Sequence, residues 1–538
     1  MPVTPSYPGL YIEELPSSSH AITAAPTSIT AFVGYTHPFQ GECAKEGLWG
    51  EAIRIFNFTD YERIFGGLYR STFIDSTVAY AVNQFFLNGG SDAYVVALQP
   101  KYFEKANLSQ ERPIDGATRY LSGIAFTAKQ LTDATHNMTV TIGNVRAGGT
   151  AGVNDTADIL IIYGSQVESL RGVKLGTTGP DFIAKRLASS RLVKVAPQPP
   201  GAYPTTFSIT GTSQSIELSK MPPPAPGFAT VAFTTFRQSD FLEVFQANSS
   251  LDKVDIFNLL VVPGVADAGV WSAALGFCER KLAFFILDPP ESVSADGSGA
   301  AAGLGTIEDV ANGNTVPTAV PNGALYFPHL KSIDPVTSKV MELPPSGSVA
   351  GIYARTDTKR GVWKAPAGLE TSILNTTGVV ERGRMTDMRQ GTLNRLGVNV
   401  LRSFPGSGTV VWGARTTVSA RENTAFQQWW YVPVRRTALF IEQSLLRNLG
   451  WVVFEPNDEP LWSAIRLSVE NFMLSLFRQG AFQGATPSQA FLVKCDKTTT
   501  LQTDIDLGIV NILVGFRPLK PAEFVIIKIA QLAGQVQA

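Results

Sequence analysis

The spacing of hydrophobic residues in the first hundred positions predicts a unit in which strands and helices alternate. An apolar run at residues 29–35 is followed by turn residues, as in a buried strand. Apolar residues recur at helical spacing from 78 to 86, and a second apolar run follows at 93–98. Strand, helix and strand in this order are typical of a parallel α/β unit.

The α/β pattern stops near residue 100 and resumes near residue 250. Between these positions Thr, Gly and Asn are frequent, helical periodicity fades, and alternating runs such as 138–142 and 159–163 predict strands. From residue 255 a strand is predicted, then a helix over 271–279 and another strand over 281–288. The sequence therefore predicts one α/β domain that is split by a β-rich insertion.

Two amphipathic helices and three strands are predicted in the C-terminal part of the chain. The first helix ends at Gly450, and its apolar face is formed by Ala438, Ile441, Leu445 and Leu449. The second helix begins after Asp458-Glu459-Pro460, and its stripe is formed by Leu461, Ile465, Val469, Phe472 and Leu476. Strands are predicted at 491–495, 510–516 and 523–529. The last strand is apolar on both faces, so it has to be covered on both sides.

The first twenty residues predict an extended arm. Prolines at positions 2, 5, 8 and 16 prevent a helix and resist folding back onto a core. Leu10, Tyr11, Ile12 and Leu15 lie within this segment and would be costly to leave in water. We therefore expect the arm to need a partner.

These elements predict an α/β and α+β multidomain protein with extended terminal arms. The expected N-terminal arm covers residues 1–22, and the split α/β domain covers 23–100 and 250–365. A β-rich peripheral insertion is expected at 101–249 and an α+β domain at 366–538.

Composition and charge argue against a nucleic-acid partner. The chain has 538 residues, with 44 Lys and Arg against 45 Asp and Glu. This balance gives no basic footprint for nucleic-acid phosphates or anionic lipid. Charged residues make up only 17%, below the roughly 25% of an ordinary soluble domain. One physical reason for missing charged surface is that other subunits cover much of it.

The cysteines and the N-terminus indicate a reducing compartment. Cys43, Cys278 and Cys495 are too far apart for a disulfide framework or a CxxC site. The N-terminus lacks a basic region followed by an apolar one, and no apolar stretch approaches the ~20 residues of a membrane span. We expect a protein that is cytosolic where it is made and does not insert into a membrane.

No catalytic, cofactor-binding or metal-ligating constellation is found in the sequence. The Gly-rich segment 296–305 fits neither P-loop nor GxGxxG spacing, which favours a flexible loop. The four histidines belong to no HExxH or GxSxG motif. The acidic segment 455–460 could bind a divalent metal, but capping of a helix explains it better. Trp429, Trp430 and Tyr431 could stack on bases, but without surrounding Lys and Arg they favour a core or an interface.

Several sequence blocks resemble the phage tail sheath family, which forms the contractile sheath of phage tails and of related bacterial contractile injection systems. The most extensive block is WVVFEPNDEPLW at 451–462. The others, in the family's order along the chain, lie at 7–14, 28–34, 88–96, 344–351, 361–368, 484–487 and 518–525. Residues 101–250 carry no such block, which fits the family's variable, outward-facing insertion.

The resemblance implies a structural role without catalysis or cofactor. It implies a subunit that stacks as hexameric rings around an inner tube in a metastable extended state, and contracts to drive the tube through a target membrane. The implied partners are further copies, the inner tube protein, the baseplate and the tail terminator or cap proteins. Assembly in the bacterial cytoplasm and a place in a phage tail or injection particle follow from the same resemblance.

The family's terminal arms reach into neighbouring subunits, and β-strand addition would satisfy both the N-terminal arm and the apolar last strand. The residues that we expect at inter-subunit contacts are Tyr7, Leu10, Tyr11, Ile12, Phe524, Val525, Ile526, Ile527 and Ile529.

An alternative class is an α/β enzyme or nucleotide-binding protein with an unrecognised site, because strand-helix-strand units often carry one. A thermal shift that depends on nucleotide would favour this alternative.

Overall fold

The computed structural model describes residues 20–69, 76–99, 101–103, 111–113, 118–121, 124–130, 132, 137–146, 155–164, 166–174, 183–195, 213–218, 236–291, 307–312, 316, 320–336, 338–380, 385–422, 424–524 and 526. Of the predicted contact residues, Tyr7, Leu10, Tyr11, Ile12, Val525, Ile527 and Ile529 lie outside these ranges.

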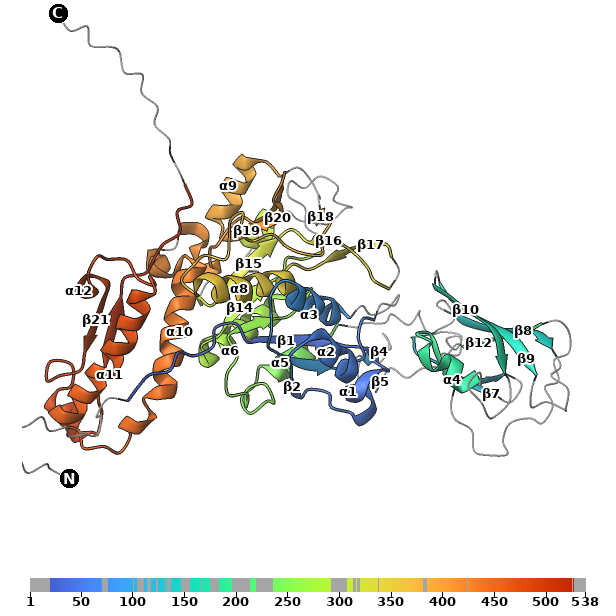
Figure 1. Cartoon of the computed structure of the whole chain (residues 1–538), viewed down its shortest axis with the longest axis horizontal. Helices are drawn as coiled ribbons and strands as arrows, with labels where there is room; N and C mark the ends of the chain where they lie inside the picture. The colour runs from blue at the N-terminus through green and yellow to red at the C-terminus, as the bar shows by residue number, and fades with distance from the viewer. Residues whose placement is uncertain are drawn as a thin grey trace, which may run out of the picture.

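An eight-stranded sheet forms the centre of the molecule, with strand order β2-β3-β1-β13-β14-β15-β19-β20 (Figure 1). The six inner strands are parallel, and the strand at each edge is antiparallel to its neighbour. The strands are β1 (Thr30–Tyr35), β2 (Ala52–Ile55), β3 (Ala93–Leu98), β13 (Leu259–Val261), β14 (Phe284–Leu287), β15 (Gly323–Phe327), β19 (Val398–Phe404) and β20 (Gly408–Val411).

Helices cover both faces of this sheet, as the continuous apolar strands require. On one face lie α2 (Phe58–Phe65), α3 (Thr77–Leu87) and α8 (Ser346–Arg360), which share a core with Phe32 and Val95. On the other lie α5 (Gln238–Val244), α6 (Ala268–Lys281), α7 (Ile307–Asn312) and α9 (Asp387–Arg395), around Ala31 and Val33. The short helix α1 (Gly41–Glu46) packs beside α2. The mixed α/β architecture predicted from the sequence is confirmed.

The helices α3 and α8 approach each other closely because α8 carries glycine at the contact. A Cβ atom on Gly347 would lie 2.4 Å from the carbonyl oxygen of Ala81, and one on Gly351 would lie 2.6 Å from that of Phe85. Both distances are too short for any larger residue, so this spacing of glycines sets the separation of the two helices.

The sheet extends beyond the expected end of the α/β domain. β19 and β20 belong to the main sheet, although the sequence analysis placed them in the C-terminal domain from residue 366. β19 pairs with β15 in parallel, across more than seventy residues of sequence. The expected boundary between residues 365 and 366 therefore falls before two strands of the same sheet.

The segment between β3 and α5 contains two antiparallel sheets with a core of their own, and β4 and β5 form a separate antiparallel pair. The larger sheet has the order β10-β9-β8-β12 and the smaller has the order β11-β7-β6. Ile142, Ile159 and Phe126 are among the buried residues of this core. Figure 1 shows the two sheets set apart from the main sheet. The elements are β4 (Lys101–Phe103), β5 (Glu111–Pro113), β6 (Thr118–Leu121), β7 (Ile124–Ala128), β8 (Met138–Arg146), β9 (Thr156–Tyr163), β10 (Gln166–Lys174), α4 (Ile183–Arg186), η1 (Leu187–Ser189), β11 (Val193–Val195) and β12 (Ser213–Leu218).

The two ends of the segment between β3 and α5 lie beside one tyrosine, Tyr35. Tyr35 is the last residue of β1, and Leu98 is its register partner at the end of β3. Where the chain returns, the backbone N–H of Arg237 donates to the Tyr35 hydroxyl at 3.1 Å, and that hydroxyl lies 3.3 Å from Asp240. The points at which the chain leaves and re-enters the main domain therefore both lie beside the Tyr35 side chain.

Two long helices dominate the C-terminal part, as predicted. They are α10 (Val432–Asn448) and α11 (Glu459–Arg478), and all five residues of the predicted α11 stripe are buried. Strands β21 (Phe491–Lys494) and β22 (Leu513–Phe516) form an antiparallel pair beside them. The shorter elements are β16 (Leu330–Ile333), β17 (Val340–Leu343), β18 (Gly378–Val379), η2 (Thr417–Glu422), η3 (Thr424–Trp429), η4 (Gly450–Val452), α12 (Pro487–Ala490) and α13 (Gln502–Asp506). Among the described helices, none has the length and apolar character needed to cross a membrane.

Candidate functional site

The first described residues of the chain lie along one side of α10. We call residues 20–29 the N-terminal root. The amide of Asn448 pairs with the backbone of Thr23 in both directions, at 3.1 and 2.9 Å. The Ser444 hydroxyl accepts from the N–H of Ala25 at 3.0 Å. Ser444 and Asn448 are one helical turn apart, so they present polar groups to the root from one face of α10.

A buried ion pair fixes the inner end of the N-terminal root. Arg436, two turns before Ser444 on α10, donates to the carbonyl of Thr27 at 2.9 Å. It also binds both carboxylate oxygens of Asp357 on α8, at 2.9 and 2.6 Å. The two side chains are only 3% and 4% exposed. The pair therefore joins the root, the main domain and the C-terminal helices at one point.

Two tyrosines complete the surroundings of this ion pair. The guanidinium of Arg436 lies 4.6 Å from the ring centre of Tyr353, whose hydroxyl is 2.5 Å from that of Tyr326. Burial acts to lower the pKa of Arg436, but the adjacent Asp357 carboxylate outweighs it and the pKa is raised. Burial also raises the pKa of Tyr353 well above its usual value. Arg436 is therefore charged, and Tyr353 neutral, across the physiological range.

The outer end of the N-terminal root lies against the end of α10. The ring of His20 stacks on Trp451 with centres 4.1 Å apart, and Ile22 packs on the core of the C-terminal helices. The predicted contact residues of the arm precede this point in the sequence and lie outside the described residues.

The last described residues are fixed at the opposite end of α10. We call residues 517–524 the C-terminal root. Glu523 forms a bidentate ion pair with Arg415, with distances of 2.6 and 3.0 Å, and both side chains are largely buried. The backbone of Arg415 forms an isolated antiparallel β-bridge with that of Tyr431, the residue that precedes α10. The C-terminal root is therefore anchored near the start of α10, whereas the outer end of the N-terminal root lies near its end.

Two of the predicted contact residues follow this ion pair and are exposed. Phe524 is 76% and Ile526 is 81% exposed in the isolated chain. The structure assigns no strand to residues 523, 524 and 526, which are the described part of the predicted strand at 523–529. A strand needs a neighbouring strand to hydrogen-bond with. Phe524 and Ile526 have the apolar character of the predicted strand, but no neighbouring strand is assigned to them.

The sheet of β21 and β22 consists of two strands among the described residues. Leu492 and Leu513 are about half exposed on its surface. A two-stranded sheet is marginal by itself, and both of its edges offer backbone groups to a further strand.

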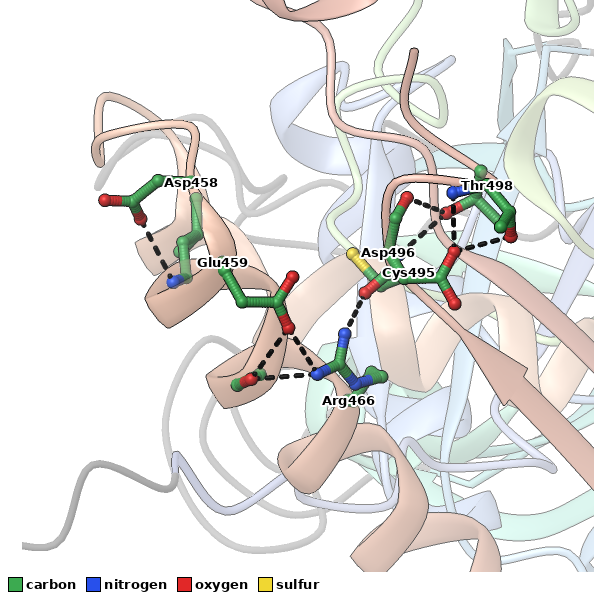
Figure 2. Close-up of polar contacts among 9 residues, drawn as sticks. Asp458, Glu459, Arg466, Cys495, Asp496 and Thr498 are labelled. Carbon is green, nitrogen blue, oxygen red and sulfur yellow. Dashed lines mark hydrogen bonds and ion pairs between the residues drawn. The ribbon is translucent and has the colours of Figure 1, made fainter. Parts of the chain in front are cut away.

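The acidic segment at the start of α11 is a helix cap, as the sequence analysis favoured. Asp458 accepts from the N–H of Leu461, and Glu459 binds Arg466 at 2.8 Å. Figure 2 shows Arg466 between Glu459 and the carbonyl of Cys495. The hydrogen bond from Arg466 lowers the pKa of Glu459. No group of His, Cys, Asp and Glu with metal-binding geometry occurs among the described residues.

The carboxyl edge of the parallel sheet is where an α/β enzyme would place its site, and it is used here to hold the fold together. Asp288 follows β14 and accepts from the N–H of Gly264 at 3.0 Å. It also accepts from the N–H and hydroxyl of Ser346 at 2.8 and 2.5 Å, and so caps α8. Burial raises the pKa of Asp288, while the Ser346 hydroxyl opposes that shift. The nearby His329 is hydrogen-bonded to the carbonyl of Pro289.

The other residues considered in the sequence analysis also have structural surroundings where they are described. His37 is buried and accepts from the N–H groups of Phe39 and Gln40, and burial lowers its pKa to about 3. Trp429 is half-buried beneath the guanidinium of Arg435. His136 and the Gly-rich segment 296–305 lie outside the described residues.

Sequence reasoning missed the residues that hold the two roots. Arg436, Ser444 and Asn448 recur at multiples of four on α10, and this polar stripe was an available signal. No local pattern indicates that Arg415 pairs with Glu523, because they are 108 residues apart.

Comparisons with known proteins match two consecutive parts of the chain to the same family. A family profile for the phage tail sheath protein central domain matches residues 246–417, and one for the phage tail sheath C-terminal domain matches residues 424–531. Together they cover more than half of the chain. The tail sheath protein of Burkholderia phage BcepMu is 32% identical over 169 residues. That match spans 30% of this chain and only a third of the length of that protein.

Two solved structures share the fold over nearly the whole chain. The helical sheath of the anti-feeding prophage in its contracted state is 23% identical, with a TM-score of 0.54, and the match covers 98% of this chain and 100% of that one. The sheath complex of the extracellular contractile injection system PVC, also contracted, is 22% identical with a TM-score of 0.55. That match covers 98% of each chain.

Proposed function

The chain belongs to the phage tail sheath family, and from this premise we propose that it is the structural subunit of a contractile sheath. In this proposal the subunits stack as hexameric rings around an inner tube, in an extended state that stores free energy. Contraction releases that energy and drives the tube through a target membrane. The sheath meets the baseplate at one end and a terminator or cap at the other, after assembly in the bacterial cytoplasm.

The observation that carries the proposal is the anchoring of the two roots. Each is fixed by a largely buried ion pair, the N-terminal root by Arg436–Asp357 and the C-terminal root by Arg415–Glu523. Firm anchoring matters because a linker transmits force between subunits only if its base does not peel away. Phe524 and Ile526 then extend the chain as exposed apolar residues, which favours a covering surface on another copy.

We propose that the terminal arms link subunits by β-strand addition. The sheet of β21 and β22 is the natural acceptor, because its two edges can each take a further strand. The predicted contact residues of both arms would supply the alternating side chains, with Leu10 and Ile12 on one face of the added strand.

The same proposal assigns a different place in the sheath to each domain of the subunit. The main sheet and the C-terminal helices form the wall of the sheath, and the sheets between β3 and α5 form a peripheral domain that folds by itself. The expected insertion at 101–249 ends too late, because α5 (Gln238–Val244) packs in the core of the main sheet. Replacing residues 101–235 by a short Gly/Ser linker should therefore leave polymerisation intact. Loss of all assembly would place that segment in the wall.

A structural role without catalysis is proposed because the enzyme-like carboxyl edge of the sheet is occupied by bonds that hold the fold. Asp288 has three donors within hydrogen-bond distance and connects three segments of the main domain. Contraction should therefore proceed without nucleoside triphosphate. A nucleotide-dependent thermal shift, or a strict nucleotide requirement for contraction, would favour the enzyme or nucleotide-binding alternative.

Electron microscopy of the purified chain tests the function directly. We expect long helical sheaths without added metal or nucleotide. Deleting residues 1–15 should leave a folded subunit with near-normal circular dichroism and abolish the extended sheath, because this Pro-rich segment precedes the first strand and resists folding onto a core of its own subunit. The substitution Ile12→Pro tests strand addition more narrowly, since proline removes one ladder donor. Contractile sheath from the arm-deleted protein would refute the linking role.

A further inference from the structure

The turn between α10 and α11 presents an aromatic side chain to solvent. Phe454 is fully exposed, and the preceding Val453 is 62% exposed. Phe454 also has a φ of 72°, in the left-handed region. A bulky residue adopts this conformation at a cost that Gly or Asn would avoid. Local strain of this kind is concentrated where the side chain is used.

The turn is held rigidly by hydrogen bonds. The N–H of Val453 donates to Gly450 and that of Glu455 donates to Val452, each at 3.3 Å. Asn457 then links the turn to its surroundings: its amide donates to the carbonyl of Ile509 at 3.0 Å and accepts from the buried Trp462 indole at 2.9 Å. Phe454 is therefore presented in a fixed position, which lowers the entropy lost when it binds.

A hollow of about 840 Å³ lies at the other end of the same two helices. Its walls come from α9, from β19, from the segments that follow α8 and β20, from the end of α11 and from the C-terminal root. Trp363, Trp412 and Ala367 contribute apolar surface, and Gly391 and Gly480 leave open space where a Cβ would stand. The volume is in the range of sites that take a bulky ligand.

The hollow cannot be filled by Phe454 of the same chain. α11 begins just after the turn and ends at Arg478, next to Gln479 and Gly480 in the wall of the hollow. A helix of 20 residues is about 30 Å long. The projecting turn and the hollow therefore lie at opposite ends of α11.

The two features are complementary in charge. Residues 450–466 contain the acids Glu455, Asp458 and Glu459 and one basic residue, Arg466, which pairs with Glu459. The wall of the hollow contains four basic side chains, Arg360, Lys364, Arg402 and Lys520, and two acidic ones. Arg402 pairs with Asp387 and Arg360 with Glu370, and the wall still keeps an excess of basic groups. An acidic projection from one copy would meet a basic rim on the next, which favours this pairing over one with a like surface.

We propose that Phe454 of one subunit inserts into this hollow on a second copy of the chain. The contact is head to tail, and a heterologous contact of this kind generates rings or open helices rather than closed dimers. The inference rests on the proposed sheath function and adds to it a side-chain contact beside the C-terminal root, whose residues 519–524 form part of the hollow's wall. The Phe454 contact would position adjacent subunits while the arms link them.

The substitution Phe454→Gly separates this contact from folding. Glycine relieves the strain at φ 72°, so the isolated subunit should melt at an equal or higher temperature. The concentration needed for assembly should rise by about tenfold or more, as for the loss of an interface anchor. Val167→Ser is the matched control, since Val167 is 60% exposed on the peripheral domain. Unchanged assembly of Phe454→Gly would overturn the proposal.

Filling the hollow tests the other side of the contact. Gly391 lies within α9, and a Cβ there would meet no atom within 4 Å, so Gly391→Phe should fold normally and block assembly. Gly276→Phe is the control, because Gly276 is also helical with open space at its Cβ and lies on α6, away from the hollow. Equal assembly of the two variants would contradict the proposal.

Cross-linking separates this contact from the wider function. Phe454→Cys combined with Gly391→Cys, treated with a short bismaleimide in assembled sheath, should give a ladder of covalent oligomers on a denaturing gel. The three native cysteines are buried, so the background is low, and Phe454→Cys with Gly276→Cys should give no ladder. Sheath without a ladder overturns the Phe454 contact and leaves the sheath function standing. A wild-type chain that forms no sheath overturns the function itself.

Discussion

Replacing Arg436 by methionine should destabilise the isolated subunit strongly. The substitution leaves the carboxylate of Asp357, which is 4% exposed, without its bidentate partner. Removing one member of a buried ion pair costs about 3–5 kcal/mol, because the remaining charge stays in a medium of low dielectric. The carbonyl of Thr27 loses its donor as well. A loss of about 4 kcal/mol is a large part of a typical folding free energy of roughly 5–15 kcal/mol.

Urea denaturation of unassembled subunit, followed by circular dichroism, measures this loss. Arg447→Met is the matched control, because Arg447 pairs with Asp255, whose side chain is 84% exposed, and such pairs contribute about 0–1 kcal/mol. The double substitution Arg436→Met with Asp357→Leu should recover much of the stability, since it removes both charges. If Arg436→Met costs no more than Arg447→Met at the same urea dependence, the reasoning on the buried pair is wrong.

Three further predictions concern buried groups. The pKa of His37 is lowered to about 3, so the unfolded chain binds a proton below about pH 6.5 that the folded chain does not. Stability should therefore fall by up to about 2 kcal/mol between pH 6.5 and 5, and His37→Asn should lose that part of the dependence in urea titrations at each pH. Burial raises the pKa of Cys43 to about 12 and that of Cys495 to about 11, so iodoacetamide at pH 8 should label these thiols only after unfolding, as mass spectrometry would show. Gly347→Val should destabilise the main domain by several kcal/mol, because its side chain would overlap the backbone of Ala81, and thermal unfolding against Gly276→Ala would measure it.

The parts of the fold that could be predicted from the sequence are those with a local signal. The apolar runs at β1, β3 and β14 and the stripe of α11 depend on spacing within a few residues, and each was found close to its observed place. The cap at Asp458 was also predicted, since the signal for a cap and its helix lie within one turn.

The parts that could not be predicted depend on contacts between distant segments. The parallel pairing of β19 with β15 cannot be read from either strand, so the boundary at residue 365 was placed too early for the sheet. Burial of Arg436 runs against the pattern of an apolar helix face, and its partner Asp357 lies 79 residues earlier. The hollow beside α9 is formed by six segments, and no spacing within one of them indicates it.

Both ends of the segment between β3 and α5 lie beside Tyr35, so this position is an attachment point on the main domain. Leu98 is the register partner of Tyr35, and the backbone N–H of Arg237 donates to the Tyr35 hydroxyl. Because the two ends of the segment between them lie this close together, that segment puts no strain on the main sheet. A foreign domain whose termini lie close together could be grafted there in place of the native one. In an assembled sheath, the same graft would repeat at every subunit and turn the particle into a regular display scaffold.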